Sequence, residues 1–493
     1  MASSPLDTSR PDRLIAAQAL SRAAGAPLLT GNAVELLIDA AVHYQRWLAA
    51  IRHARKRVLL ENYIIRDDSV GRAFRDALVE RALAGVFVAV VCDWVGCLGQ
   101  SGAAFWKPLR EAGGQVRVFN RPQLGRPFGW ISRDHRKVLV VDGELGFLSG
   151  VCISEKWLGD PSRGVAPWRD TGVALRGPAV AEVEAAFGRS WAGTGAPLPR
   201  WPAEALHEPP GQVSLRVIAT EPSTAGLYRL DQQIAAMARK TLWLTDAYFV
   251  GVAPYVQALA AAARDGVDVR LLVPGSSDIP MVAGLSRSGY RPLLKAGVRV
   301  FEWNGSMIHA KTAVADGIWA RVGSSNLNVA SWLGNREIDV AVEDQGFARQ
   351  LAEQYETDLG NATEIVLAPR RRLRGERVQR SGEDPAAQLR RAARRPRGGN
   401  GSSGRAAASA LRLANSVGAV LTDRRVLGDT DISPLVIGTV ALTVLAVVAA
   451  LWPAIIAWPL ALLSAWFALN LAVRAWRTRQ ARQRRRQDDD DAN

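Results

Sequence analysis

The feature that most constrains the fold of this 493-residue chain is an internal repeat of apolar runs. In each copy, three short apolar runs rich in β-branched residues alternate with a helix-like stretch, which ends near Leu83 in the first copy and near Ala263 in the second. Such alternation is typical of α/β layers around a buried sheet. We therefore expect two similar α/β domains that face each other. The runs lie at 58–65, 84–94 and 112–119, and again at 242–250, 265–275 and 296–303.

Each copy is followed by the same short motif, H-x-K-x4-D, and the two occurrences are 174 positions apart. The apolar tetrapeptide between the lysine and the aspartate predicts a strand, and alternation along a strand puts the histidine and the lysine on one face. A reactive histidine and a phosphate-binding ammonium group can therefore point into one pocket. The candidate catalytic residues are His135, Lys137 and Asp142 in the first motif and His309, Lys311 and Asp316 in the second.

The rarity of these residue types makes the repeated motif informative. The chain has five histidines and seven lysines, because arginine supplies nearly all of its positive charge. By chance, about a tenth of one His-x-Lys pair is expected, and two are found. A compact ammonium group, not a planar guanidinium, is evidently required at these two places.

Polar residues downstream of the motifs complete the candidate site. Ser324 and Asn326 lie in a small-residue turn whose hydroxyl, amide and backbone N–H groups can hold phosphate oxygens, and Ser149 lies in the matching turn of the first copy. Asp170 and Glu337 follow further on, and a carboxylate that accepts from one ring nitrogen fixes the tautomer of a histidine. Which carboxylate orients which histidine is left open by the sequence.

The positive charge is concentrated towards the C-terminus. Of the formal net charge of +15, residues 370–431 carry +9 and residues 474–493 carry +3, which leaves +3 for residues 1–369. A nearly neutral body with basic flanks favours an anionic membrane surface over a nucleic acid as the partner. We therefore expect phospholipid and membrane partners and no nucleic acid.

An uncharged segment between these basic flanks predicts a transmembrane hairpin. Residues 432–473 contain no charged side chain, and Pro453 divides them into two stretches of about 20 residues, each the length of one bilayer crossing. Because both flanks are basic, both are expected on the cytoplasmic side of the cell membrane, together with the catalytic domains. The expected organisation is a first domain (1–205), a second domain (206–368), a basic flexible linker (369–431), two transmembrane helices (432–473) and a charged tail (474–493).

These residues resemble the phospholipase D superfamily, whose signature H-x-K-x4-D-x6-G-S-x-N occurs twice in its members. The segments around both motifs, over about residues 33–345, are similar to the cardiolipin synthase branch in particular. The first copy departs from the signature, because Ser149-Gly150 stands in place of Gly-Ser and Cys152 in place of Asn. The resemblance implies two α/β/α sandwich domains related by a pseudo-twofold axis around one active site.

The resemblance also implies a reaction. One histidine, assigned as His135, attacks the phosphodiester phosphorus and forms a phosphohistidine, while His309 acts as acid and then as base. The lysines, Ser324 and Asn326 stabilise the phosphate oxygens. No metal or other cofactor is expected. In the branch that this chain resembles, two phosphatidylglycerol molecules give cardiolipin and glycerol. A hydrolase on the same scaffold, a nuclease of the superfamily and a non-catalytic membrane scaffold are the alternatives.

Overall fold

The computed structural model describes residues 11–122, 132–201, 208–279, 284–287, 289–367 and 424–427, and single positions at Thr443, Trp458, Ala465 and Trp466. The predicted linker, membrane hairpin and tail therefore lie almost entirely outside the described residues. Within the described residues, no helix combines the length and the apolar character that a bilayer crossing requires.

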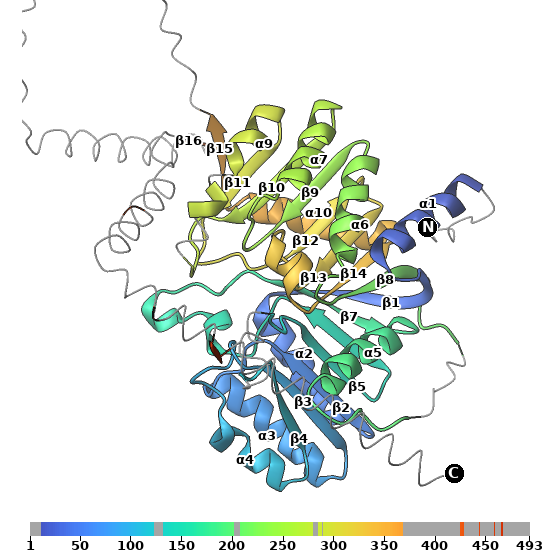
Figure 1. The fold of residues 1–493 in the computed structure, drawn as a ribbon, viewed down its shortest axis with the longest axis vertical. Coiled ribbons are helices and arrows are strands. Elements are labelled where there is room, and N and C mark those ends of the chain that lie inside the picture. The colour runs from blue at the N-terminus through green and yellow to red at the C-terminus, as the bar shows by residue number, and fades with distance from the viewer. Residues whose placement is uncertain are drawn as a thin grey trace, which may run out of the picture.

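The two halves of the chain contain the same succession of strands and helices (Figure 1). The N-terminal half comprises α1 (Pro11–Ala24), β1 (Leu29–Ile38), α2 (Asp39–His53), β2 (Arg57–Asn62), α3 (Ser69–Leu83), β3 (Phe87–Asp93), α4 (Ala103–Glu111), β4 (Gln115–Phe119), β5 (Lys137–Val141), β6 (Leu145–Ser149), the 3-10 turns η2 (Glu155–Leu158) and η3 (Pro161–Arg163), β7 (Thr171–Arg176) and α5 (Ala179–Ala192). The second half comprises β8 (Val213–Thr220), α6 (Gly226–Met237), β9 (Thr241–Thr245), α7 (Ala253–Arg264), β10 (Asp268–Pro274), α9 (Tyr290–Ala296), β11 (Arg299–Trp303), β12 (Thr312–Ala315), β13 (Trp319–Gly323), the π-helical turn η4 (Ala330–Gly334), β14 (Glu337–Glu343), α10 (Gln345–Leu359) and β15 (Ala362–Leu367), after which comes β16 (Arg424–Leu427).

The strand order shows the repeat in three dimensions. The first half has the order β4-β3-β2-β5-β6-β7-β1, and the second has the matching order β11-β10-β9-β12-β13-β14-β8. In each half three parallel strands are followed by antiparallel ones. Strands β1 and β8 pair with each other and join the halves, while β15 and β16 extend the far edge of the second half. The two similar α/β units predicted from the repeat are confirmed.

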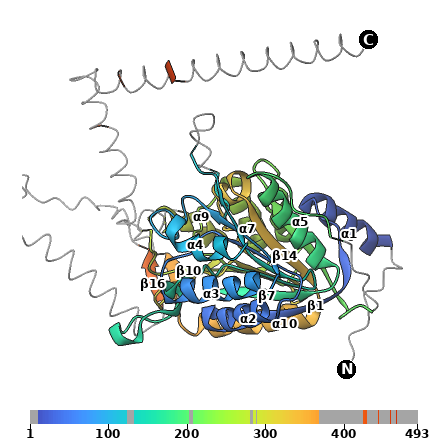
Figure 2. The same cartoon turned by 90° about the horizontal axis from the view of Figure 1, so that it is seen from below.

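Strand alternation places helices on both faces of the first sheet. Val58 and Leu60 of β2 are buried in one core with residues of α2 and α3, whereas Leu59 between them is buried in a second core with residues of α5. Figure 2 shows α5 on one side of the strands and α2 on the other. The predicted sandwich of helices around a buried sheet is therefore the architecture of this half.

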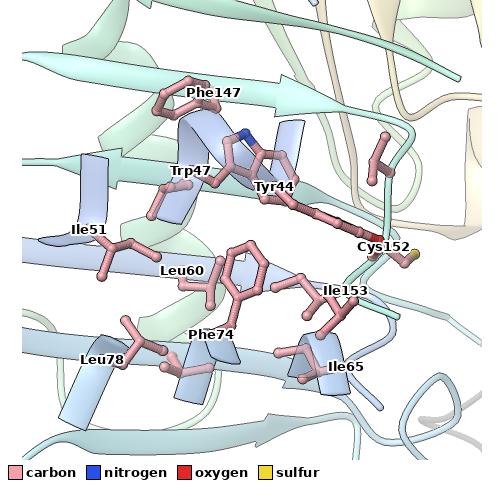
Figure 3. Close-up of a cluster of buried hydrophobic side chains, with 14 of the residues drawn as sticks. Tyr44, Trp47, Ile51, Leu60, Ile65, Phe74, Leu78, Phe147, Cys152 and Ile153 are labelled. Carbon is pink, nitrogen blue, oxygen red and sulfur yellow. The ribbon is translucent and has the colours of Figure 1, made fainter. Parts of the chain in front are cut away.

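The core beneath the first motif is built on aromatic side chains (Figure 3). Trp47 of α2 is fully buried and makes edge-to-face contacts with Phe74 of α3 and Phe147 of β6. The hydroxyl of Tyr44, one helical turn before Trp47, donates to the carbonyl oxygen of Cys152 at 2.5 Å. This packing ties α2 to the loop that follows β6, which is the predicted phosphate-binding turn of the first half.

The two halves share one continuous core. Val140 and Leu175 of the first half are fully buried in the same cluster as Val322 and Val340 of the second. Burying a side chain of this kind stabilises a fold by about 1.5–3 kcal/mol. The halves are therefore joined by hydrophobic packing as well as by the β1–β8 pairing.

Helix α1 belongs by its contacts to the second half. Its residues Leu20 and Ala24 are buried against Leu227 and Leu230 of α6. The sequence boundary at residue 205 had placed this segment in the first domain. The difference arises because the repeated pattern begins only after α1, so the sequence offers no sign of where this helix packs.

Candidate active site

The two motifs lie at equivalent places in the two halves, where the central strands β5 and β12 begin. Strand β5 is antiparallel to β2, so its first residue, Lys137, pairs with Asn62 at the end of β2. In the second half Thr312, next to Lys311, pairs in the same way with Thr245 at the end of β9. The histidines precede these strands instead of lying within them, which corrects the expectation that each His-x-Lys pair forms part of a strand.

Each histidine is anchored by the backbone of the opposite half. The N–H of His135 donates to the carbonyl of Arg336 at 2.9 Å, and the N–H of His309 donates to the carbonyl of Arg169 at 2.7 Å. Single parallel bridges run beside both contacts. The halves therefore interlock at the two candidate catalytic residues.

The imidazole rings are also held from the opposite half. Nδ1 of His135 lies 2.9 Å from Oε2 of Glu337, and Nδ1 of His309 lies 2.8 Å from Oδ2 of Asp170. A carboxylate in this position accepts the Nδ1 proton and leaves Nε2 with its lone pair. The pairing left open by the sequence is thus crossed between the halves, and both rings present Nε2 as the reactive nitrogen.

Burial keeps both histidines neutral in the resting site. Loss of hydration lowers the pKa of His135 to about 4; the carboxylate of Glu337 opposes this shift, and the ammonium of Lys137 adds to it. Burial likewise lowers the pKa of His309 to about 4. The ammonium of Lys311 lowers this pKa further, and the carboxylate of Asp170 opposes the shift. Burial by itself raises the pKa of Asp170 and of Glu337, but the facing histidines and lysines outweigh it, so both carboxyl pKa values lie below their usual range.

The two lysines of the motifs are fully buried beside the histidines. Nζ of Lys137 donates to the carbonyl of His135 at 2.5 Å, and Nζ of Lys311 donates to the carbonyl of His309. Burial, opposed by Asp170 and reinforced by Lys137, lowers the pKa of Lys311 to about 8. Lys137 contributes to the lowered pKa of Lys311, so the two ammonium groups act within one site, together with the carboxylates of Asp170 and Glu337.

The predicted phosphate-binding serines are engaged elsewhere. Ser324 donates its hydroxyl proton to Oε2 of Glu337 at 2.7 Å and thereby orients that carboxylate. The hydroxyl of Ser149 accepts the N–H of Val151 at 3.0 Å and closes a turn. Asn326 differs from both: it is 4% exposed, and its side-chain oxygen is buried without a hydrogen-bond partner among the described residues. A phosphate oxygen accepts hydrogen bonds, so the Nδ2 group of Asn326, and not this oxygen, is the donor that the turn offers to a phosphate.

The first half has no serine that matches Ser324, and an indole donates to the carboxylate in its place. Gly150 occupies the position that matches Ser324, and a Cβ atom there would lie 2.2 Å from Oδ1 of Asp170. The indole N–H of Trp157 instead donates to Oδ2 of Asp170 at 3.0 Å. The carboxylate oxygen that faces each histidine thus has a neutral side-chain donor, Ser324 for Glu337 and Trp157 for Asp170, and the other oxygen of Glu337 accepts from Asn335.

The aspartates of the two motifs lie outside the catalytic centre. Asp142 follows the last residue of β5, at the opposite end of the strand from Lys137, and accepts the backbone N–H groups of residues 55–57 at 2.7–2.9 Å. Asp316 accepts those of residues 239–241 at the same distances. Both residues have positive φ angles, 56° and 52°. The prediction that they belong with the catalytic residues is corrected, because their carboxylates tie a helix end to a strand.

A substitution at Asp142 is therefore expected to affect stability and not chemistry. Asp142→Ala removes three hydrogen bonds from a charged acceptor and puts alanine at a positive φ, so we expect it to lower the free energy of unfolding by about 2–4 kcal/mol. Asp142→Asn keeps an acceptor and tolerates this backbone conformation, and it should recover most of the loss. Thermal unfolding and the turnover of the folded fraction measure the two effects; a folded Asp142→Asn protein with abolished turnover contradicts this assignment.

Aromatic rings, which the two motifs do not predict, enclose both histidines. The ring of Tyr63 lies 4.8 Å from His135, and that of Tyr248 lies 5.7 Å from His309. Trp157 and Trp168 each lie 5.5 Å from His309. Tyr63 follows the last residue of β2 by one position and Tyr248 follows that of β9 by three, so the repeat does not align the two tyrosines. The tripeptide Trp-Leu-Gly occurs in both halves, at 157–159 and 332–334, and this repetition is a signal for Trp157.

Cys152, which stands where the second half has Asn326, is buried close to this centre. Burial raises the pKa of its thiol to about 11, against the attraction of Lys137 and Lys311. The thiol is therefore neutral and cannot replace the amide as a strong phosphate donor.

Comparison with known proteins agrees with this site. Residues 231–359 match the family described as "Cardiolipin synthase, PLD-like domain". The chain is 34% identical over 371 residues to cardiolipin synthase A of Pseudomonas aeruginosa, covering 74% of each protein, and 32% identical over 361 residues to cardiolipin synthase A of Pseudomonas putida, covering 71% of this chain and 73% of that protein. The crystal structure of phosphatidylserine synthase from Haemophilus influenzae Rd KW20 covers 70% of this chain and 91% of its own, with 15% identity and a TM-score of 0.52, which is a likeness of fold.

The paired histidine–lysine site and the similarity to the cardiolipin synthases together define the phospholipase D-like class of phosphatidyl-transferring enzymes. Within that class, this chain belongs to the cardiolipin synthase family.

Proposed function

We propose that this protein transfers the phosphatidyl group of one phosphatidylglycerol to a second one, forming cardiolipin and releasing glycerol. The observation that carries the proposal is the crossed pair of carboxylate–histidine contacts. Each half orients the histidine of the other, so that two reactive Nε2 atoms and two buried ammonium groups belong to one centre. The similarity to two cardiolipin synthases supports the choice of substrate.

In the first step Nε2 of His135 attacks phosphorus and forms an N–P bond. The bond between phosphorus and the glycerol oxygen breaks, and His309 gives its proton to that oxygen. His309 must therefore be protonated when substrate is bound, although its pKa is about 4 in the empty site. An anionic phosphodiester between Lys137 and Lys311 offsets their repulsion of the imidazolium and raises that pKa.

In the second step the roles reverse. Neutral His309 takes the proton from the hydroxyl of the second phosphatidylglycerol, whose oxygen attacks phosphorus while the N–P bond breaks. Lys137, Lys311 and the amide of Asn326 stabilise the equatorial oxygens of both transition states. Asp170 and Glu337 keep each Nδ1 protonated throughout, so that proton exchange occurs at Nε2.

We further propose that the chain is held at the cytoplasmic face of the cell membrane by the hairpin 432–473. The support is the charge-free length of this segment and its basic flanks. A lipid substrate whose acyl chains stay in the bilayer requires such proximity.

A product assay tests the proposal. Membranes or mixed micelles containing the full chain are incubated with acyl-labelled phosphatidylglycerol, and the lipid products are separated. Cardiolipin with stoichiometric release of glycerol is the expected result. Phosphatidic acid without cardiolipin would show a hydrolase instead, and DNA cleavage that disappears in His309→Ala would show a nuclease.

A further inference from the structure

An ion pair between the halves lies next to the aromatic rings that surround His309. Nζ of Lys156, in η2 of the first half, lies 3.1 Å from Oδ2 of Asp278, in the loop after β10 of the second. Their side chains are 39% and 29% exposed, so the pair is open to solvent although His309 is 4% exposed. The pair therefore lies between solvent and the buried reaction centre.

The pair is connected to the walls of the site by two direct contacts. The hydroxyl of Tyr248 donates to Oδ1 of Asp278 at 2.7 Å, and Nζ of Lys156 lies over the ring of Trp168, 4.3 Å from its centroid. Tyr248 and Trp168 are two of the rings that enclose His309. Asp278 and Lys156 are thus each one side chain away from the imidazole.

The side of the site next to His135 has a cationic group where the side next to His309 has Asp278. On the His135 side, Tyr63 accepts a hydrogen bond from the guanidinium of Arg133 at 3.3 Å. The tyrosine beside the proposed nucleophile His135 therefore has a cationic partner, whereas the tyrosine beside His309 has an anionic one. A carboxylate is a good acceptor for hydroxyl groups.

We propose that Asp278 and Lys156 form the subsite that selects the acceptor alcohol: Asp278 accepts hydrogen bonds from glycerol hydroxyls, and Lys156 binds the phosphate of the accepting lipid. The inference rests on the proposed function, in which both the leaving and the accepting glycerol meet His309. An ion pair that is partly exposed is weak, so an acceptor that offers both hydroxyls and a phosphate can replace it. Phosphatidylglycerol has both groups, free glycerol has hydroxyls only, and ethanol has neither a second hydroxyl nor a phosphate.

Competition between acceptors tests this assignment. The full chain is given acyl-labelled phosphatidylglycerol together with deuterated glycerol and ethanol, and mass spectrometry measures cardiolipin, deuterium-labelled phosphatidylglycerol and phosphatidylethanol. All three products arise from the same phosphohistidine, so their ratios are independent of the donor step. In Asp278→Asn we expect both glycerol-derived products to fall about tenfold relative to phosphatidylethanol. In Lys156→Gln we expect cardiolipin to fall about tenfold relative to deuterated phosphatidylglycerol, with the latter unchanged relative to phosphatidylethanol.

Two further variants separate recognition from support of the fold. Lys156→Asp combined with Asp278→Lys restores an ion pair with reversed positions; if the pair only holds the halves together, this double variant recovers the product ratios, and that result overturns the proposal. Glu35→Gln, which removes one partner of the exposed pair with Arg46, is the control and should leave the ratios unchanged. Wild-type product ratios in Asp278→Asn overturn the acceptor subsite alone, whereas a wild-type protein that makes no cardiolipin overturns the proposed function.

Discussion

Alanine in place of either His135 or His309 is expected to lower cardiolipin formation by about 10⁴-fold or more. One substitution removes the group that forms the bond to phosphorus, and the other removes the group that protonates the leaving alcohol. Because the two histidines serve one reaction, the double variant should be little worse than either single one. Initial rates with labelled phosphatidylglycerol measure the effect, and His53→Ala, at an exposed position on α2, is the matched control.

The same variants distinguish the roles of the two histidines. A phosphatidyl ester of p-nitrophenol has a leaving group that needs no proton, so His309→Ala should still react with it and accumulate a phosphohistidine. His135→Ala should release no p-nitrophenol. The opposite pattern reverses the assignment of nucleophile and acid, and an undiminished rate of cardiolipin formation in either variant refutes the two-histidine mechanism.

The second large effect is expected at the crossed carboxylates. Asp170→Asn and Glu337→Gln keep the size of the side chain but remove the charge that fixes the tautomer and stabilises the imidazolium, and we expect each to lower kcat by about 10²–10⁴-fold. Both carboxylates are fully buried, so folding must be checked by thermal unfolding. Turnover within tenfold of wild type in both variants would contradict this role.

The pH dependence of kcat shows whether Asp170 acts on His309 through its charge or only through packing. The charge of Asp170 raises the pKa of His309, so Asp170→Asn lowers that pKa further. Since His309 must be protonated to release glycerol, it then loses its proton at a lower pH. The basic limb of the kcat profile should therefore move to lower pH in Asp170→Asn. In Asp142→Asn, whose carboxylate lies at the far end of β5, the profile should stay in place.

Much of the fold follows from local patterns along the chain. The runs that predicted strands contain β3, β4, β10 and β11 and cover all but the first residue of β2 and of β9, because buried parallel strands are continuously apolar. The strands of the motifs, β5 and β12, are likewise where the apolar tetrapeptides placed them. The pairing of β1 with β8 and the docking of α1 on α6 depend on contacts between distant segments that no local period encodes.

The residue types of the candidate site could be predicted from the sequence, but the contacts between them could not. The repeat identifies His135 and His309 as equivalent, yet it gives no sign that Glu337 and Asp170 serve the histidine of the other half. The motif also grouped Asp142 with the reactive residues, because spacing alone does not show that a five-residue strand carries it away from the site. The sequence repeats Trp-Leu-Gly at 157–159 and 332–334, but nothing in it indicates that the indole of Trp157 donates to Asp170.

The crossed anchoring of the histidines has a consequence for biosynthesis. As the chain leaves the ribosome, the first half emerges with its own histidine and lysine but without Arg336 and Glu337, which hold His135 in place. N-terminal domains generally fold before the rest of a chain has been synthesised. The nascent first half therefore contains the proposed nucleophile, His135, with neither its orienting carboxylate nor the proposed proton donor. We therefore expect catalytic competence only after the second half has folded against the first, so that incomplete chains leave phospholipids intact.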